Sequence, residues 1–187
     1  PNGGSVEDEC GVCDGPGADA GHDCDGNCVD AAICGSTTIS FSNVSSGSAD
    51  VNYSSNVDVY GFQFNVEGVT LIGASSAFDM TSSGNNVALG FSVSGASLPA
   101  GEGSLVTLTF EETTTGSTIS LSNVIISGAD GASIYGGGPD SADVAACDNA
   151  DCAGDCGGSA ELDDCGVCNG GNADDLGCGC GEAGPSG

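Results

Sequence analysis

The stretches VDVYGFQFNV (57–66) and SLVTLTFE (104–111) decide the fold class of this chain of 187 residues. In both, apolar side chains alternate with polar or small ones, which is the pattern of a β-strand with one face in a protein core. Comparable short runs rich in Val, Ile, Thr and Phe recur along the middle of the chain, separated by turns of Gly, Ser, Asn and Pro. They predict strands at about 37–44, 48–54, 57–66, 69–73, 86–94, 104–111, 117–127 and 132–136.

Eight or nine such strands in roughly 110 residues predict two antiparallel sheets packed face to face. No window has helical periodicity, apart from a possible turn near residues 77–80. The predicted fold class is therefore all-β: a jelly-roll-like antiparallel β-sandwich flanked by two disulfide-rich irregular arms. We place the first arm at 1–34, the sandwich at 35–146 and the second arm at 147–187.

All 12 cysteines lie outside the predicted strands. Gly- and Asp-rich segments with few apolar residues cannot form a core of their own, so we predict that disulfides cross-link them in an oxidising, extracellular compartment. Zinc is the alternative, suggested by CGVC at 10–13 and 165–168, but zinc fingers usually carry basic residues and histidines. The cysteines are Cys10, Cys13, Cys24, Cys28, Cys34, Cys147, Cys152, Cys156, Cys165, Cys168, Cys178 and Cys180.

The cysteine count of each arm is odd. The first arm has five and the second has seven, so at least one bridge joins the two arms or joins two subunits. Cys34 directly precedes the first predicted strand and Cys147 directly follows the last. We therefore hypothesise a Cys34–Cys147 bridge, which would stabilise the sandwich by about 4–5 kcal/mol in the chain-entropy model.

The arms are related to each other by an internal repeat. DECGVCDG (8–15) matches DDCGVCNG (163–170), and DCAGDCGG (151–158) is a degenerate third copy. Short repeats of this kind favour a rod-like arrangement in which each unit contacts only its neighbours.

The chain contains no lysine and no arginine, and its 27 acidic residues give a formal charge of −27. Binding to nucleic acid or to an anionic membrane through basic side chains is therefore excluded. Since no protein cation can neutralise the carboxylates, we expect bound Ca²⁺, which prefers six to eight oxygen ligands. Solvated carboxylates that keep a secreted protein soluble are the alternative.

Candidate calcium ligands are the carboxylate and amide oxygens that alternate with glycine in both arms. They are Asp14, Asp19, Asp23, Asp25, Asn27, Asp30, Asp148, Asp151, Asp155, Asp163, Asp164, Asn169, Asn172, Asp174 and Asp175.

No enzyme is predicted. No serine or cysteine nucleophile has a plausible general base, because the single histidine, His22, lies in a disulfide-rich arm. Asn43 and Asn52 head Asn-X-Ser triplets and are candidate N-glycosylation sites, although such triplets are frequent by chance in a Ser-rich sequence. Six aromatic residues are expected to pack in the core and against neighbouring strands: Tyr53, Tyr60, Phe62, Phe64, Phe91 and Phe110.

The strand region resembles cohesin-like domains, the jelly-roll sandwiches of bacterial extracellular proteins that bind dockerin modules. The resemblance is carried by VDVYGFQFNVEGVTLIGAS (57–75), NVALGFSVSGASLPAGEGSLVTLTFE (86–111) and STISLSNVIISGADG (117–131). The flanking DECGVCDG-type segments look like Cys/Gly/Asp repeats of long secreted and surface proteins of environmental bacteria.

Two functions follow from these features. The first is a secreted or cell-surface structural protein: a calcium-stabilised, disulfide-linked unit of a fibre or long adhesin. Its partners would be copies of itself, in a head-to-tail homopolymer or in a tandem array. The alternative, implied by the resemblance, is a recognition module that binds a dockerin-like or glycan partner and presents one apolar patch.

Overall fold

A computed structural model describes residues 6–174 and 179–181 of the chain. The chain divides into two compact units, Pro1–Glu111 with Thr118–Val144 and Glu112–Ser117 with Ala145–Gly187. The first unit holds the strands together with the first arm, and the second unit holds the second arm. No helix in the described ranges is long and apolar enough to cross a membrane.

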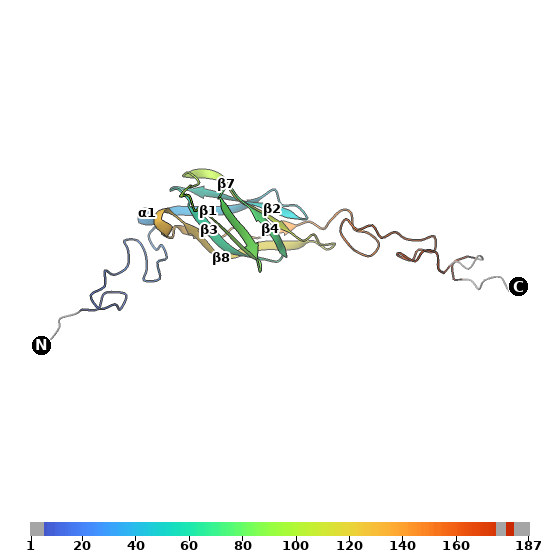
Figure 1. Ribbon diagram of the computed structural model, residues 1–187, viewed down its shortest axis with the longest axis horizontal. Helices are drawn as coiled ribbons and strands as arrows, with labels where there is room; N and C mark the ends of the chain where they lie inside the picture. Colours follow the sequence, from blue (N-terminus) through green and yellow to red (C-terminus); the bar gives the residue numbers. More distant parts are fainter. Residues whose placement is uncertain (1–5, 175–178, 182–187) are drawn as a thin grey trace. The chain divides into compact units, whose positions relative to one another are not determined.

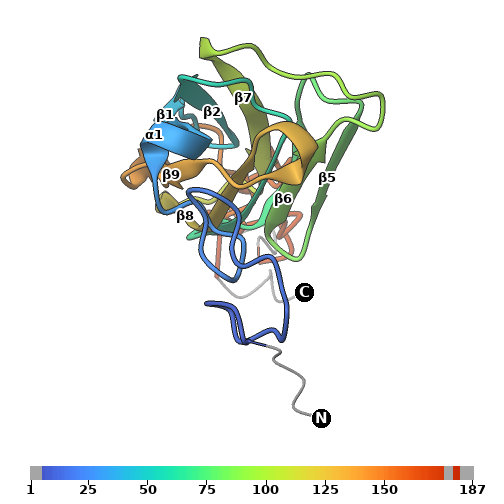
Figure 2. The same cartoon turned by 90° about the vertical axis from the view of Figure 1, so that its left-hand side faces the viewer.

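The strands form two five-stranded sheets (Figure 1). In strand order, the first sheet contains β4 (Leu71–Ser75), β7 (Gly101–Phe110), β2 (Ser48–Ser55), β1 (Ser36–Ser42) and β9 (Tyr135–Gly137). The second contains β10 (Ala142–Val144), β8 (Ser117–Ser127), β3 (Gly61–Glu67), β6 (Val87–Phe91) and β5 (Met80–Gly84). The end-on view of Figure 2 shows β1 and β2 in one layer and β5 and β6 in the other. The predicted all-β sandwich is confirmed.

The pairs β1–β2, β2–β7, β4–β7, β3–β6, β3–β8 and β5–β6 are antiparallel, and the pair β1–β9 is parallel. Two strands, β5 and β10, were not predicted, and the last predicted strand shifts to Tyr135–Gly137. A single helical turn, α1 (Ala31–Cys34), precedes β1, and a short 3-10 turn covers Ala129–Gly131.

The core lies between the sheets and is built from alternate residues of each strand. In β3 the buried side chains are Phe62, Phe64 and Val66, while Gln63 and Glu67 point outward. The rings of Phe62 and Phe64 are stacked with centroids 5.3 Å apart, an arrangement that adds to the burial of their apolar area. The largest fully buried side chains of the opposing sheet include Leu105, Leu108 and Phe110 of β7.

Small residues occupy the inward positions of β6, and large ones point outward. Gly90 lies under the ring of Phe62, where an added Cβ would come within 2.3 Å of a ring carbon. Phe91 therefore takes the outward position and is 40% exposed, so it lies outside the core, opposite Gly61 and Met80 of the neighbouring strands. The reason is steric, because the Phe62 ring already fills the space above this strand.

The turn between β3 and β4 requires glycine. Gly68 has φ +83°, in the left-handed region that side chains disfavour. A Cβ at this position would lie 1.8 Å from the carbonyl oxygen of Thr118 in β8. The close backbone approach fixes the end of β3 against β8.

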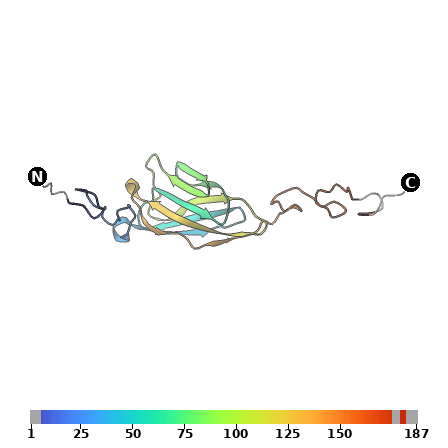
Figure 3. The same cartoon turned by 90° about the horizontal axis from the view of Figure 1, so that it is seen from below.

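The second arm contains no strand or helix among its described residues, and Figure 3 draws it as loops. Its order comes from isolated β-bridges, Ala150–Cys156 and Leu162–Cys168. The first arm repeats the arrangement with Glu7–Cys13 and His22–Cys28. Each bridge closes a small hairpin loop that begins with an aspartate and ends with a cysteine.

Candidate functional site

One face of the sandwich carries a cluster of exposed apolar side chains. In the register of β8, β3, β6 and β5, one row across the sheet is Ser127, Gly61, Phe91 and Met80. The next row is Ile125, Gln63, Leu89 and Ser82. All of these residues point away from the core, because their neighbours along each strand point into it. We call Met80, Val87, Leu89, Phe91 and Ile125 the apolar face.

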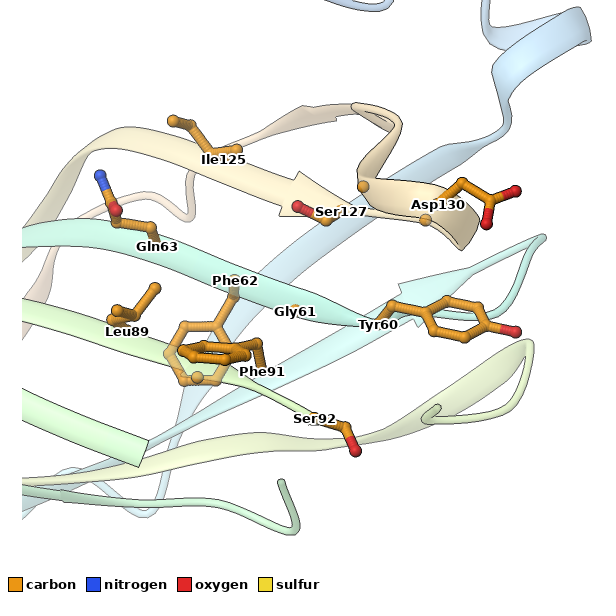
Figure 4. Close-up of a pocket in the computed structure, with 13 residues that line it drawn as sticks. Tyr60, Gly61, Phe62, Gln63, Leu89, Phe91, Ser92, Ile125, Ser127 and Asp130 are labelled. Carbon is orange, nitrogen blue, oxygen red and sulfur yellow. The ribbon is translucent and has the colours of Figure 1, made fainter. Parts of the chain in front are cut away.

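The apolar face borders a hollow of about 440 Å³ (Figure 4). Tyr60 and Asp130 lie at one end of the hollow, and Gln63, Leu89 and Ile125 lie at the other. Gly61 leaves room between Ser127 and Phe91, where any side chain would be crowded by the Gly90 carbonyl oxygen and the Cβ of Phe91. Ile125 and Met80 are both 48% exposed, so this surface leaves apolar area in contact with solvent.

Carboxylates surround the apolar face. Asp130 lines the hollow, Glu67 lies on the same side of β3, and Asp79 directly precedes Met80. The Asp79 carboxylate accepts hydrogen bonds from the backbone N–H groups of Val93 and Ser94. The pKa of Asp79 is lowered, chiefly by a hydrogen bond from the hydroxyl of Ser92. The chain has no lysine or arginine to offset these charges. The site therefore combines an apolar centre with an anionic surround.

The outward face of the other sheet is polar across β1, β2 and β7. One row there is Ser40, Asn52 and Ser104, and the next is Thr38, Ser54 and Glu102. These six residues line a shallow hollow of about 480 Å³ with hydroxyl, amide and carboxylate groups. The outward rows across β1, β2 and β7 thus differ in chemistry from the apolar face on the other sheet.

The described cysteines pair within their own arms. The bridges are Cys10–Cys24 and Cys28–Cys34 in the first arm, and Cys147–Cys156, Cys152–Cys168 and Cys165–Cys180 in the second. Cys13 is exposed and has no bridge to any described cysteine, and Cys178 lies outside the described residues.

The hypothesis of a Cys34–Cys147 bridge was wrong. Each of these cysteines finds a partner close by in the sequence, Cys28 six residues before Cys34 and Cys156 nine residues after Cys147. Local pairing closes short loops and needs no contact between the two ends of the sandwich.

Several predicted calcium ligands bind backbone N–H groups of their own loops. Oδ1 of Asp163 accepts from Cys165 and Val167, each at 2.9 Å, and Oδ2 accepts from Asn172 at 2.9 Å. Asp151 does the same with Ala153 and Asp155 on Oδ1 and with Ala160 on Oδ2. The pKa of Asp163 is lowered, chiefly by the hydrogen bond from the backbone N–H of Val167. The pKa of Asp151 is lowered in the same way, chiefly by the backbone N–H of Asp155.

Asp23 and Asp8 organise the two loops of the first arm in the same way. Oδ1 of Asp23 accepts from Asp25 and Asn27, and the amide side chain of Asn27 lowers the pKa of Asp23 most. Asp8, which was not among the predicted ligands, accepts from Cys10, Val12 and Gly17. The signal that could have found Asp8 is its alignment with Asp163 in the repeat.

The predicted ligands that the structure describes are not gathered into one cluster of carboxylates. Within the described ranges, a single group of three His, Cys, Asp or Glu ligand atoms lies within 4.8 Å of one another: Glu112, Cys147 and Cys156. Its two sulfurs are bonded to each other, which leaves them unsuited to a metal. Asn172 donates from its amide to Asp164, and Asp175 lies outside the described residues. Calcium binding stays a prediction.

His22 faces carbonyl oxygens. Its Nδ1 lies 3.2 Å from the carbonyl oxygen of Ala20 and its Nε2 lies 3.2 Å from that of Ser133. A neutral imidazole carries a single N–H, so one of these two carbonyl oxygens accepts a hydrogen bond from the ring.

The two glycosylation candidates lie on or beside the polar face. Asn43 is exposed and donates to the Asp50 carboxylate at 2.8 Å, while Asn52 is half-buried and donates to the Ser42 hydroxyl at 2.7 Å. Glycosylation stays a prediction for both.

No family model matches the chain, and no curated protein matches it. Among solved structures, the chain is similar to a type I cohesin from Clostridium thermocellum, solved as a cohesin–dockerin complex, with 13% identity and a TM-score of 0.43 over 59% of this chain and 91% of that one. It is also similar to a non-cellulosomal cohesin from the archaeon Archaeoglobus fulgidus (18% identity, TM-score 0.40, 59% and 92% covered). A third is the cohesin module of a Clostridium perfringens family 33 glycoside hydrolase (17% identity, TM-score 0.42, 59% and 95% covered). The fold class rests on the two sheets described above.

Proposed function

We propose that this chain is a secreted, non-catalytic recognition module that binds a protein partner through the apolar face. The observation that carries this function is the exposed apolar cluster around the hollow at Gly61, on the outward side of β8, β3, β6 and β5. Apolar patches bordered by polar residues mark interaction surfaces on soluble proteins. The disulfides fit an extracellular location, where such bonds persist.

The charge of the site defines the partner. A chain with a formal charge of −27 and no basic side chain binds best to a surface with an apolar centre and basic residues or bound cations around it. Because the sequence resembles cohesin-like domains, a dockerin-like module is the first partner to test. A glycan is less suited, since the apolar face presents no tryptophan for a sugar to stack on.

The test compares two isoleucine-to-aspartate substitutions by calorimetric titration with a panel of purified dockerin modules. Ile125→Asp places a charge in the apolar face. Ile72→Asp makes the same change at a β4 residue that is 59% exposed and lies in the other sheet. We expect at least one dockerin to bind, Ile125→Asp to weaken it by tenfold or more, and Ile72→Asp to leave it unchanged. No binding by any module, or equal weakening by both substitutions, would contradict the proposal.

A second candidate function is a structural unit of an extracellular fibre or long adhesin, stabilised by calcium. It is favoured by the repeated loops of the second arm, where disulfides join each loop to the next part of the chain. Repeats that contact only their neighbours are typical of extended structural proteins. Copies with a charge of −27 repel one another unless cations screen or bridge them. Negative-stain imaging and sedimentation, first with calcium and then with EGTA, should show filaments that loosen on chelation. Single particles in both conditions would exclude this function.

A further inference from the structure

The apolar hollow at Gly61 shares its rim with a second hollow beside the first arm. The first arm and the sandwich belong to the same compact unit. They meet at His22 of the arm, whose Nε2 lies 3.2 Å from the carbonyl oxygen of Ser133. The second hollow, of about 620 Å³, is lined by residues of the arm and by Asp130 and Gly131 of the 3-10 turn. The same two residues line the apolar hollow, so the turn is a common border.

A third hollow, of about 360 Å³, makes this surface continuous. It shares Tyr60 and Gly128 with the apolar hollow, and it shares His22 and Ala132 with the hollow beside the arm. Figure 4 shows Tyr60 at the same end of the apolar hollow as Asp130. Each pair of hollows therefore has lining residues in common. We call the surface that the three hollows form the junction.

The hollow beside the arm is acidic. Four carboxylates line it: Asp8, Asp19, Asp23 and Asp130. Those of Asp8 and Asp23 accept hydrogen bonds from backbone N–H groups of their own loops. Asp19 and Asp130 are exposed, and the chain has no lysine or arginine to pair with them. This end of the junction therefore favours a ligand with positive charge.

The other end of the junction is apolar. Phe91 and Ile125 are 40% and 48% exposed, and Gly61 on the strand between theirs has no side chain to fill the space. The apolar hollow, of about 440 Å³, is in the size range of pockets that bury most of a ligand, so it has room for one large apolar side chain. Acidic side chains alone would attract any cation. The apolar hollow next to them is the separate observation that selects the ligand.

We propose that the junction binds an exposed segment of a partner protein in which an aromatic residue lies a few positions from lysines or arginines. The aromatic side chain fills the apolar hollow, and the basic side chains pair with Asp19 and Asp130. Aromatic and arginine side chains are the usual anchors of protein interfaces, and opposite charges around them speed association. This inference rests on the proposed function, because it uses the same apolar face, and it adds the first arm to the binding surface.

The test uses a fluorescent peptide as the probe. Since the chain has no tryptophan, the emission of a tryptophan-containing peptide reports binding without background. The probe is the hexapeptide acetyl-WGGKRK-amide, titrated with the full oxidised chain. We expect its emission to move to shorter wavelength as the indole ring leaves water. Acetyl-WGGEQE-amide keeps the anchor but reverses the charge, and it should give no shift. Acetyl-AGGKRK-amide lacks the anchor, and roughly tenfold more of it should be needed to displace the probe.

Two substitutions test the acidic end of the junction. Asp130→Asn and Asp19→Asn each remove one charge, and asparagine tolerates the left-handed backbone of residue 130, where φ is 57°. We expect each to weaken binding of the probe about threefold. The matched control is Asp140→Asn, at an exposed position outside the three hollows, which should leave binding unchanged. Far-UV circular dichroism checks that each variant retains the sandwich.

The inference is overturned if the probe shows no shift, if the acidic peptide binds as tightly, or if Asp140→Asn weakens binding as much as Asp130→Asn does. An unchanged affinity in Asp19→Asn would overturn the part of the first arm in the surface. If a dockerin module binds in the Ile125→Asp comparison while the probe does not, the basic aromatic ligand is overturned and the proposed function stands. Binding of the probe without binding of any dockerin would support the junction and reject dockerins as its partner.

Discussion

Asp163 shows how single side chains order the arms. Its carboxylate accepts hydrogen bonds from three backbone N–H groups that lie outside any strand or helix. Asp8, Asp23 and Asp151 hold equivalent positions, so one residue type substitutes for regular secondary structure in each loop. From the sequence we predicted most of these aspartates as metal ligands, because carboxylates that alternate with glycine fit both roles. Only the backbone conformation shows which N–H groups each oxygen faces.

Asp163→Ala should loosen its loop. The substitution leaves the N–H groups of Cys165, Val167 and Asn172 without their acceptor, so we expect their amide hydrogen exchange to speed up by at least tenfold. Asp148→Ala, at an exposed position of the same arm, is the matched control and should leave these rates unchanged. Equal rates in both variants would show that the bridges alone hold the loop.

The loops should also respond to acid. The pKa values of Asp8, Asp151 and Asp163 are lowered below the usual 3.8, chiefly by backbone N–H groups of Val12, Asp155 and Val167. A carboxyl group whose pKa is lowered in the folded state stabilises the loop at pH values above its unfolded-state pKa. This stabilisation is lost as the pH falls through the folded-state pKa. The amide resonances of Val12, Asp155 and Val167 should therefore shift together below about pH 4. Resonances that stay constant down to pH 2 would argue against these hydrogen bonds.

At the scale of single elements, the turn between β3 and β4 depends on Gly68. Gly68→Ala combines a left-handed φ with a clash against the Thr118 carbonyl, so it should destabilise the sandwich by about 2–4 kcal/mol. Gly95→Ala is the matched control. Gly95 also has a positive φ, but nothing lies within 4 Å of its added Cβ, so the cost should be about 1 kcal/mol. Urea unfolding of both variants measures the difference, and equal losses would mean that the clash relaxes.

The longer strands could be predicted from the sequence because their apolar residues alternate. This holds for β3, β7 and β8, whose predicted and observed ranges overlap over most of their length. The edge strand β5 (Met80–Gly84) was missed because its sequence MTSSG has no apolar alternation, and its pairing with β6 comes from tertiary context. The apolar face was missed for a related reason. Phe91 is as hydrophobic as a core residue, and only the ring of Phe62 above Gly90 shows that it must point outward.

For the whole molecule, the sandwich should be independent of the disulfides. All described bridges lie before β1 or after β10, and the strands of the sandwich are held by the apolar core and by the hydrogen bonds of the two sheets. We expect full reduction to leave the far-UV β-sheet signal and a cooperative unfolding transition in place, while the amides of the second arm lose their protection from exchange. Loss of the sheet signal on reduction alone would show that the arms support the fold.

The overlapping bridges of the second arm also set how it bears a pulling force. The three bridges overlap in sequence: Cys147–Cys156, Cys152–Cys168 and Cys165–Cys180. The shortest covalent route from Cys147 to Cys180 therefore crosses all three, and it follows the backbone only through residues 152–156 and 165–168. With bridged Cα atoms 5.9, 5.6 and 5.2 Å apart, the route stretches to roughly 40 Å, against about 115 Å for the same segment without bridges. The arm would behave as a tether of nearly fixed length under tension, and one cut in the backbone between Cys147 and Cys180 would leave its ends attached.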